Sequence, residues 1–200
     1  MAVPSPSKTA LVLVDMQNDF LHPEGAYGRA GQHSHSIVEL PDRLAPLATT
    51  FRAAGAWIVS THFTLVPGKD GEPYISGHLR TLRPFLGRGD FAPGGTGHAL
   101  IDELAPSHIQ IEKVAFSAFY QSRMEWVLRK FGIETLVFGG IVTNGGVAST
   151  IRDAHARDFH SVLLEDGCGA FGVETHETAI RSLANVADIC TCAEVASWWV

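Results

Sequence analysis

Short apolar runs alternate along the chain with longer stretches in which apolar residues recur every three or four positions. The first run is Ala-Leu-Val-Leu-Val at residues 10–14, and a stretch with helical spacing follows at residues 36–54. Strands of a parallel sheet have continuous apolar runs because helices cover both faces of the sheet. The pattern therefore predicts an α/β fold in three layers, with a parallel sheet of Rossmann-like topology between helices.

The same pattern places six strands and a series of helices in alternation. Strands are expected at residues 10–14, 57–60, 109–113, 135–138, 161–164 and 186–190. Helices are expected at residues 36–54, 122–131, 145–158 and 174–186, with a short helix at the end of the chain. In the helix at residues 122–131, we expect Trp126, Val127 and Phe131 to be buried. Connections this short predict right-handed crossovers and a single domain over residues 1–200.

One connection departs from this regular alternation. Residues 66–97 are rich in Gly, Pro, His and charged residues and have no clear periodicity. The connection is too long for an ordinary turn, and long segments of this kind commonly form substrate loops or lids. We therefore expect residues 66–97 to form part of the wall of a binding site.

Composition and charge limit the class of protein. The chain has 200 residues, 46% of them hydrophobic and 18% charged, which is typical of a globular protein and excludes disorder. A net charge of -6 argues against nucleic acid as a partner, because phosphates bind basic surfaces. The chain has only 3 cysteines, which indicates a reducing compartment. Neither a membrane-spanning stretch nor a signal peptide is evident, so we expect a cytoplasmic protein without membrane contact.

Candidate chemistry lies at the predicted carboxyl ends of the strands, where open α/β sheets bind their ligands. Asp15 follows the first strand, Lys113 ends the third, and the glycine-rich turn at residues 140–146 follows the fourth. An acid and a lysine beside a turn that opens a helix could perform catalysis, with backbone N–H groups stabilising an oxyanion. The alternative is structural, since carboxylates at strand ends also cap turns and form ion pairs.

Three segments resemble the motifs of a known family. They are Leu-Val-Asp-Met-Gln-Asn-Asp-Phe at residues 13–20, Glu-Lys-Val-Ala-Phe-Ser-Ala-Phe at residues 112–119, and the glycine-rich run at residues 140–154. In this order and spacing they resemble the isochorismatase-like hydrolases, also called the cysteine hydrolase superfamily. The resemblance covers residues 8–195, and three motifs in register are more specific than any one of them.

The resemblance implies a six-stranded parallel sheet and a catalytic triad of Asp, Lys and Cys. It assigns Asp15 as the general acid and base and Lys113 as its charge partner. It also implies a cis peptide bond near Val142 and Thr143, and an oxyanion hole built from backbone N–H groups of Val142, Thr143 and Gly146. The family's nucleophilic cysteine falls at position 146, where this chain has glycine.

Glycine at position 146 excludes a thioester intermediate at that position, because glycine has no side chain. The chain resembles in this respect the true isochorismatases, which hydrolyse a vinyl ether by Asp-assisted addition of water. Those enzymes have Tyr-Ala-His before the glycine, whereas this chain has Val142, Thr143 and Asn144, so isochorismate is not the expected substrate. Two alternatives stay open: a cysteine amidohydrolase with a substituted nucleophile, natural or engineered, and a non-catalytic protein that binds a small molecule.

Residues near the motifs are candidates for a pocket that holds a small polar substrate. They are Phe20, His62, Phe116, Phe119, Tyr120 and Asn144, and core packing is the alternative for the three aromatic residues after Lys113. Zinc-binding members of the family have Asp-x-His after the second strand, where this chain has Thr61, His62 and Phe63. We therefore expect no metal and no organic cofactor.

The remaining polar and terminal residues have simpler interpretations. Asp19 is expected to cap the loop after the first strand. Cys168 could replace the missing nucleophile, but no base or helix N-terminus is specifically aimed at it. The apolar end of the chain, Ser-Trp-Trp-Val at residues 197–200, predicts a buried tail or a subunit interface. Together with the resemblance it suggests a homo-oligomer, a dimer or a tetramer.

Overall fold

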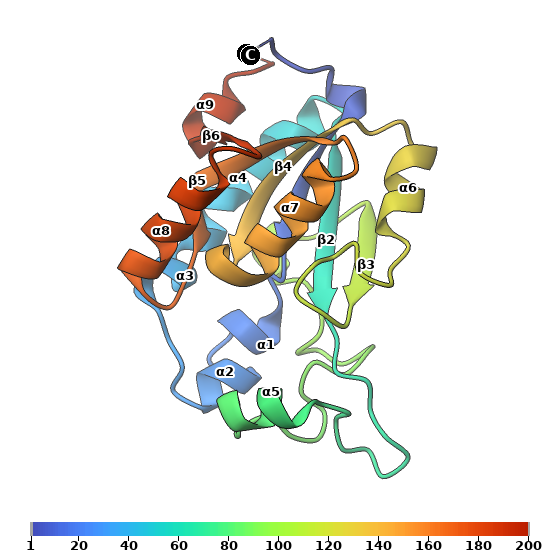
Figure 1. The fold of residues 1–200 in the computed structure, drawn as a ribbon, viewed down its shortest axis with the longest axis vertical. Helices are drawn as coiled ribbons and strands as arrows, with labels where there is room; N and C mark the ends of the chain where they lie inside the picture. The colour runs from blue at the N-terminus through green and yellow to red at the C-terminus, as the bar shows by residue number, and fades with distance from the viewer. Residues whose placement is uncertain (1, 200) are drawn as a thin grey trace.

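The computed structural model describes residues 2–199, and its centre is one sheet of six parallel strands in the order β3-β2-β1-β4-β5-β6 (Figure 1). The strands are β1 (Thr9–Val14), β2 (Trp57–Phe63), β3 (Ile109–Lys113), β4 (Thr135–Ile141), β5 (His160–Gly169) and β6 (Asp188–Cys190). All neighbouring strands pair in parallel register. The predicted α/β fold is confirmed. Strands β2, β4 and β5 extend beyond their predicted ends, toward the edge where the candidate residues lie.

Helices cover both faces of the sheet and bury two separate apolar layers. One face carries α6 (Met124–Lys130), α7 (Ala148–His155) and α8 (Val173–Leu183), which pack against alternate residues of β1 such as Val12. The other face carries α3 (His35–Val38), α4 (Leu40–Ala53) and α9 (Cys192–Ala196), which pack against the intervening residues such as Leu13. This alternation along β1 produces the three layers, because successive side chains of a strand point to opposite faces.

Two helices differ from the sequence-based expectation. The expected helix at residues 36–54 is divided at Glu39 into α3 and α4, with proline in the first turn of α4, where its missing N–H is tolerated. The prediction that Trp126 and Phe131 are buried is wrong, because they are 65% and 51% exposed. Helix α6 is short and buries Met124, Val127 and Leu128 instead.

The long connection between β2 and β3, residues 64–108, is called the β2–β3 segment below. It contains α5 (Gly77–Leu82) and a 3₁₀ turn, Asp102–Leu104, and it lies with α1 (Asn18–Leu21) and α2 (Ala26–Arg29) at the end of the molecule toward which β2 and β3 point (Figure 1). An apolar cluster packs the segment against α2. It includes Tyr27 of α2 together with Leu65, Leu86 and Phe91 of the segment.

Polar contacts from the chain after β1 hold the β2–β3 segment in place. The backbone N–H of Asp19 donates to the carbonyl of Gly97 over 2.8 Å, and the Asp19 carboxylate accepts the N–H groups of Phe91 and Ala26 at 2.6 and 3.0 Å. A Cβ atom on Gly97 would overlap the Asp19 carboxylate, so only glycine fits there. Asp19 therefore has the loop-capping geometry expected of it.

The two ends of the described chain meet beside α4. The ring of Trp199 packs edge-on against Phe51, with ring centroids 5.0 Å apart, and its Nε1–H donates to the carbonyl of Pro4 over 2.9 Å. The tail is thus partly buried, one of the two outcomes expected for it. Within residues 2–199, no helix combines the length and the apolar character needed to cross a bilayer.

Candidate active site

Asp15 follows the last residue of β1 in a backbone conformation that few residues adopt. Its φ angle is 55°, in the left-handed region, where an L-residue costs roughly 1–2 kcal/mol and aspartate is better tolerated than most. The Asp15 N–H donates to both the carbonyl and the Oγ1 of Thr61, at 3.1 and 3.2 Å. These contacts fix the residue at the carboxyl end of the strand.

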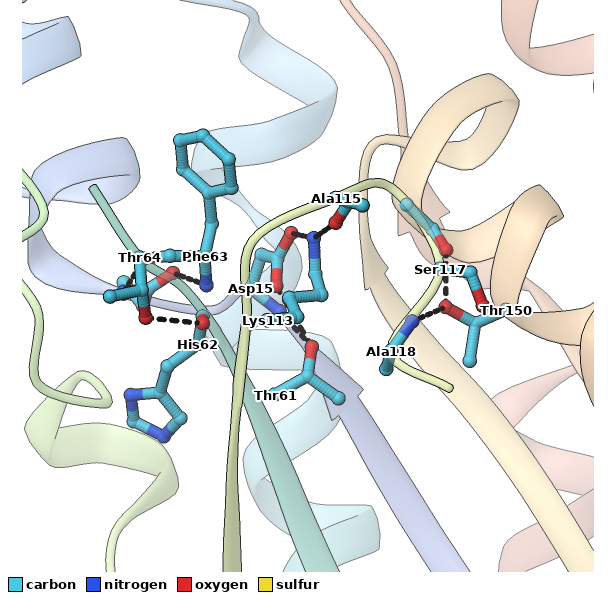
Figure 2. A network of polar contacts seen from close by, with 12 residues as sticks. Asp15, Thr61, His62, Phe63, Thr64, Lys113, Ala115, Ser117, Ala118 and Thr150 are labelled. Carbon is cyan, nitrogen blue, oxygen red and sulfur yellow. Dashed lines mark hydrogen bonds and ion pairs between the residues drawn. The ribbon is translucent and has the colours of Figure 1, made fainter. Parts of the chain in front are cut away.

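The side chains of Asp15 and Lys113 form a buried ion pair, hereafter the dyad. Lys113 Nζ lies 2.7 Å from Asp15 Oδ2, and the two side chains are 1% and 6% exposed, respectively. Thr61 Oγ1 donates to Asp15 Oδ1 over 2.8 Å, and Lys113 Nζ also donates to the carbonyl of Ala115 over 3.1 Å (Figure 2). Strands β1, β2 and β3 thus each contribute one group to the same point.

The environment of Asp15 affects its proton affinity in two directions. Burial raises the pKa of the Asp15 carboxyl, because the charged form loses its hydration. The Lys113 ammonium and the Thr61 hydroxyl oppose this increase but do not cancel it, so the pKa remains above the usual aspartate value. A carboxyl in this condition can both give and take a proton nearer to neutral pH than an exposed one.

The glycine-rich turn after β4 comes directly against the dyad. The peptide bond between Ile141 and Val142 is cis, one bond before the expected position, and a π-helical turn, Thr143–Val147, leads into α7. A Cβ atom on Gly146 would lie 3.3 Å from Asp15 Oδ2 and 3.2 Å from the carbonyl oxygen of Ile141. The structure therefore brings Asp15, Lys113 and Gly146 together, and a side chain at position 146 would reach the Asp15 carboxylate.

Three supporting residues were not singled out by the sequence analysis. Thr61 orients Asp15, and it could have been found because it lies at the carboxyl end of a strand beside Asp15. Thr150 Oγ1 donates to the carbonyl of Gly146 over 2.6 Å and accepts the N–H of Ala118 at 3.1 Å. His176 Nδ1 lies 2.8 Å from Thr143 Oγ1. No sequence signal connects either of these pairs, which come from separate elements.

Some of the predicted pocket residues lie near the turn. Phe116 is 69% exposed, and its ring lies 3.7 Å from the position of a Cβ on Gly145. Asn144 is exposed and lines a cavity of about 400 Å³ between α7 and α8, separate from the dyad. Tyr120 is 52% exposed. Of this group, Phe116 covers the turn most directly.

The other predicted pocket residues lie elsewhere. Phe119 is buried in the core against Phe159, with ring centroids 5.8 Å apart, so it packs the interior rather than lining a pocket. Phe20 belongs to the aromatic cluster beneath the β2–β3 segment, 4.5 Å from Phe91 between ring centroids. The His62 ring points away from the dyad (Figure 2). Its position on the strand explains this, because Thr61 and His62 face opposite sides of the sheet.

A cavity of about 340 Å³ lies near the dyad, although neither Asp15 nor Lys113 lines it. Its walls include Phe63 and Val114, and Leu65, Tyr74 and Leu79 line it from the β2–β3 segment. The Phe63 ring separates this cavity from the buried ammonium by a single side chain, because its ring centre is 5.4 Å from Lys113 Nζ. The segment at residues 66–97 thus supplies part of a cavity wall near the dyad.

Two other kinds of reactive group could take part in the chemistry: the cysteines, and side chains of the types that bind metal ions. Cys168 is buried and donates to the carbonyl of Phe138 over 3.5 Å, and burial raises the pKa of its thiol. A thiol held in its protonated form is a poor nucleophile, which argues against Cys168 as a replacement for the missing cysteine. Within residues 2–199, no three His, Cys, Asp or Glu side chains are grouped to hold a metal ion.

Comparison with known proteins agrees with this geometry. The isochorismatase domain family matches residues 9–194. The chain is 34% identical over 191 residues to a ureidoacrylate amidohydrolase, RutB, of Acinetobacter baylyi, covering 90% of this chain and 78% of that protein. A ureidoacrylate amidohydrolase of Azorhizobium caulinodans is 35% identical over 180 residues, covering 84% and 78%. The chain therefore belongs to the isochorismatase family of hydrolases, and the resemblance stated from its motifs is confirmed.

Solved structures show the same fold. A cysteine hydrolase from Pseudomonas syringae pv. phaseolicola superposes with a TM-score of 0.83 at 24% identity, covering 99% of this chain and 95% of that one. N-carbamoylsarcosine amidase from Thermoplasma acidophilum superposes with a TM-score of 0.72 at 26% identity, covering 92% and 96%.

Proposed function

We propose that this hydrolase cleaves a small polar molecule by addition of water, without a covalent thioester. The observation that carries the proposal is the contact of Gly146 with the dyad. Position 146 faces Asp15 Oδ2 at the distance where a side chain would meet it, and the residue there has no side chain. No side chain at position 146 can therefore act as a nucleophile, and Asp15 is the reactive group of the site.

The proposed chemistry uses both protonation states of Asp15. With a vinyl ether, protonated Asp15 gives its proton to the vinyl carbon, water adds to the resulting oxocarbenium carbon, and a proton of that water returns to the carboxylate. The hemiketal formed in this way then collapses to a carbonyl compound: its C–O bond to the ether oxygen breaks, and the proton of its hydroxyl passes to the alcohol that leaves. With a C–N bond, ionised Asp15 takes a proton from the attacking water and passes it to the leaving nitrogen. Lys113 stabilises the carboxylate form. In the C–N reaction, backbone N–H groups of Val142, Thr143 and Gly146 face the negative charge that develops on the carbonyl oxygen.

An amidohydrolase whose nucleophile position has been substituted is the second candidate. The specific observation in its favour is the similarity to proteins named ureidoacrylate amidohydrolase, at 34% identity over most of this chain. The backbone at Gly146 has an ordinary φ angle, so a cysteine there meets no conformational barrier. Its Cβ would be tight against the Ile141 carbonyl, at 3.2 Å.

Parallel assays of the unmodified chain, Gly146→Cys, Gly146→Ala and Asp15→Asn distinguish the two candidates. Each protein is assayed against a panel of small vinyl ethers and a panel of small amides and ureido acids. Gly146→Ala is the matched control, because it adds the same Cβ as cysteine without the thiol. We expect the unmodified chain to hydrolyse a panel member and Asp15→Asn to lose about 10²–10⁴-fold of that rate.

The two candidates predict opposite effects of a thiol at position 146. Under the proposal, Gly146→Cys and Gly146→Ala both slow the reaction, because each places a Cβ atom 3.3 Å from Asp15 Oδ2 and crowds the carboxyl. Mass spectrometry then detects no acylated protein. If only Gly146→Cys cleaves amides, with an acyl group on its thiol, the water-addition proposal is wrong and the second candidate is correct.

A further inference from the structure

A second polar cavity lies on the opposite side of β2 from the dyad. Its volume is about 820 Å³, and it runs along β3, the edge strand of the sheet. His62 and His98 line its inner wall, and Glu112 and Arg123 line its outer part. His62 and Glu112 are register partners on β2 and β3, so their side chains point to the same side of the sheet. None of these residues has a part in the proposed hydrolysis.

A chain of hydrogen bonds runs along the inner wall of the cavity. His62 Nδ1 lies 2.8 Å from the carbonyl oxygen of His98, which can only accept, so Nδ1 carries the proton. His62 Nε2 lies 2.8 Å from the Ser60 hydroxyl. The Ser60 hydroxyl in turn lies 2.8 Å from the Ser107 hydroxyl. Ser107 lines the cavity and offers it a hydroxyl group.

The hydrogen bonds of His98 show which of its ring nitrogens carries the proton. Thr64 Oγ1 donates to the carbonyl of His62 over 3.0 Å, so it accepts from His98 Nε2–H at 2.8 Å. Burial and the nearby His62 ring lower the pKa of His98, which favours the neutral ring. His98 is only 8% exposed, and its Nδ1 has no hydrogen-bond partner among residues 2–199. An unpartnered acceptor on a buried ring therefore remains at the wall of the cavity.

Charges complete the description of the cavity. Glu112 is exposed at its rim, and none of the ion pairs within the described chain uses it. Arg123 donates through Nη2 to the carbonyl of Gln110 over 2.9 Å, which leaves other guanidinium N–H groups for a ligand. The cavity thus offers two acceptors, His98 Nδ1 and the charged Glu112 carboxylate, together with the Ser107 hydroxyl and one cationic donor, Arg123.

We propose that this cavity binds a small zwitterion. Its N–H-rich cation, a guanidinium or an ammonium, would contact Glu112, His98 and Ser107, and its carboxylate would contact Arg123. A group with several N–H donors can donate to Glu112 and to His98 Nδ1, neither of which has a proton to give. The two-pronged guanidinium of Arg123 can bind both oxygens of a carboxylate. The volume lies within the range of small-molecule sites.

Calorimetric titration of the full chain with three related probes tests the proposal. The probes are L-arginine, L-citrulline, whose neutral ureido group replaces the guanidinium, and agmatine, which lacks the carboxylate. We expect L-arginine to bind with a Kd on the order of 1 mM or tighter and L-citrulline about tenfold more weakly. The Glu112→Gln variant should lose about tenfold in affinity for L-arginine, whereas Glu103→Gln, an exposed glutamate outside the cavity, should not.

Two further variants locate the binding. Arg123→Met should weaken L-arginine but leave agmatine unchanged, because only L-arginine has a carboxylate. Asp15→Asn should bind L-arginine as the parent does. The proposal is overturned if L-arginine does not bind at tens of millimolar or if Glu112→Gln binds it normally. It is also overturned if Asp15→Asn abolishes the binding, because the ligand would then occupy the dyad site.

Discussion

At the dyad, two opposing electrostatic effects act on the pKa of the Asp15 carboxyl. Burial raises the pKa of Asp15, and the Lys113 ammonium at 2.7 Å lowers it. Removing one member of a buried pair leaves the other charge uncompensated, which costs about 3–5 kcal/mol when that charge cannot be neutralised. Asp15 can be neutralised by taking up a proton, so the cost of losing Lys113 should depend on pH.

The Lys113→Met variant should be destabilised most at high pH. Without the ammonium, the pKa of Asp15 in the folded state rises further above its value in the unfolded chain. Between those two pKa values the folded state holds more protons than the unfolded state, so the free energy of unfolding falls as pH rises. Urea unfolding at a series of pH values should show the loss growing upward from about pH 4.

Lys8→Met is the matched control for this effect. Lys8 pairs with Glu134 at 2.7 Å, but those side chains are 54% and 63% exposed. An exposed pair contributes about 0–1 kcal/mol, so this variant should change little at any pH. A loss in Lys113→Met that stays constant from pH 4 to pH 9 would contradict the assignment of a raised pKa to Asp15.

Among the elements, the β2–β3 segment depends on contacts made by the chain just after β1. Gln17 is fully buried, and its side chain donates to the carbonyls of Phe63 and His98 at 3.0 Å each. Asn18 Nδ2 donates to the carbonyl of Thr96 over 2.9 Å, and Asp19 accepts the N–H groups of Phe91 and Ala26. The motif that provides Asp15 thus also holds the segment that walls the cavity near the dyad.

The Asp19→Ala variant should loosen this segment. It leaves the buried N–H groups of Phe91 and Ala26 without their acceptor, at about 1–3 kcal/mol for each group. Trypsin should then cleave faster after Lys69, Arg80 and Arg88, which are exposed in the segment. Asp70→Ala changes an exposed aspartate of the same segment and should leave the cleavage rate unaltered. Equal rates for both variants would exclude Asp19 as the anchor.

The sequence predicted the strands and helices that have regular apolar patterns. It did not predict features that depend on contacts between segments far apart in the chain. Apolar runs located all six strands, and the rule that ligands bind at strand ends brought Asp15 and Lys113 together. Helix α6 is too short for its periodicity to identify a buried face, and Phe131 packs on Trp57 instead of the core. The contact between Thr143 and His176 depends on how α8 packs against the turn, which no local pattern encodes.

For the whole molecule, the contact between the two ends of the described chain covers α4. Trp199 packs against Phe51 and donates to Pro4, and α9 packs on the same helix. A partly buried tryptophan whose N–H has an acceptor stabilises the folded state in two ways. It buries apolar surface, and it packs edge-on against an aromatic partner.

The Trp199→Ala variant should lower the free energy of unfolding by about 2–3 kcal/mol, which is below the loss for a fully buried tryptophan. Urea unfolding followed by circular dichroism measures this change. Trp126→Ala removes the same side chain from a position that is 65% exposed and should change stability by less than about 1 kcal/mol. A similar loss in both variants would show that the end-to-end contact contributes little.

The backbone geometry at Gly146 also bears on how this site could evolve. Glycine and cysteine codons can differ by a single base, and position 146 has an ordinary φ angle, so a side chain there requires only a small shift of the Ile141 carbonyl, 3.2 Å from its Cβ. Asp15, Lys113 and the turn would stay in place through such a mutation, because their contacts come from β1, β2, β3 and α7 rather than from residue 146. A lineage could therefore pass between chemistry with and without a thiol in one mutational step.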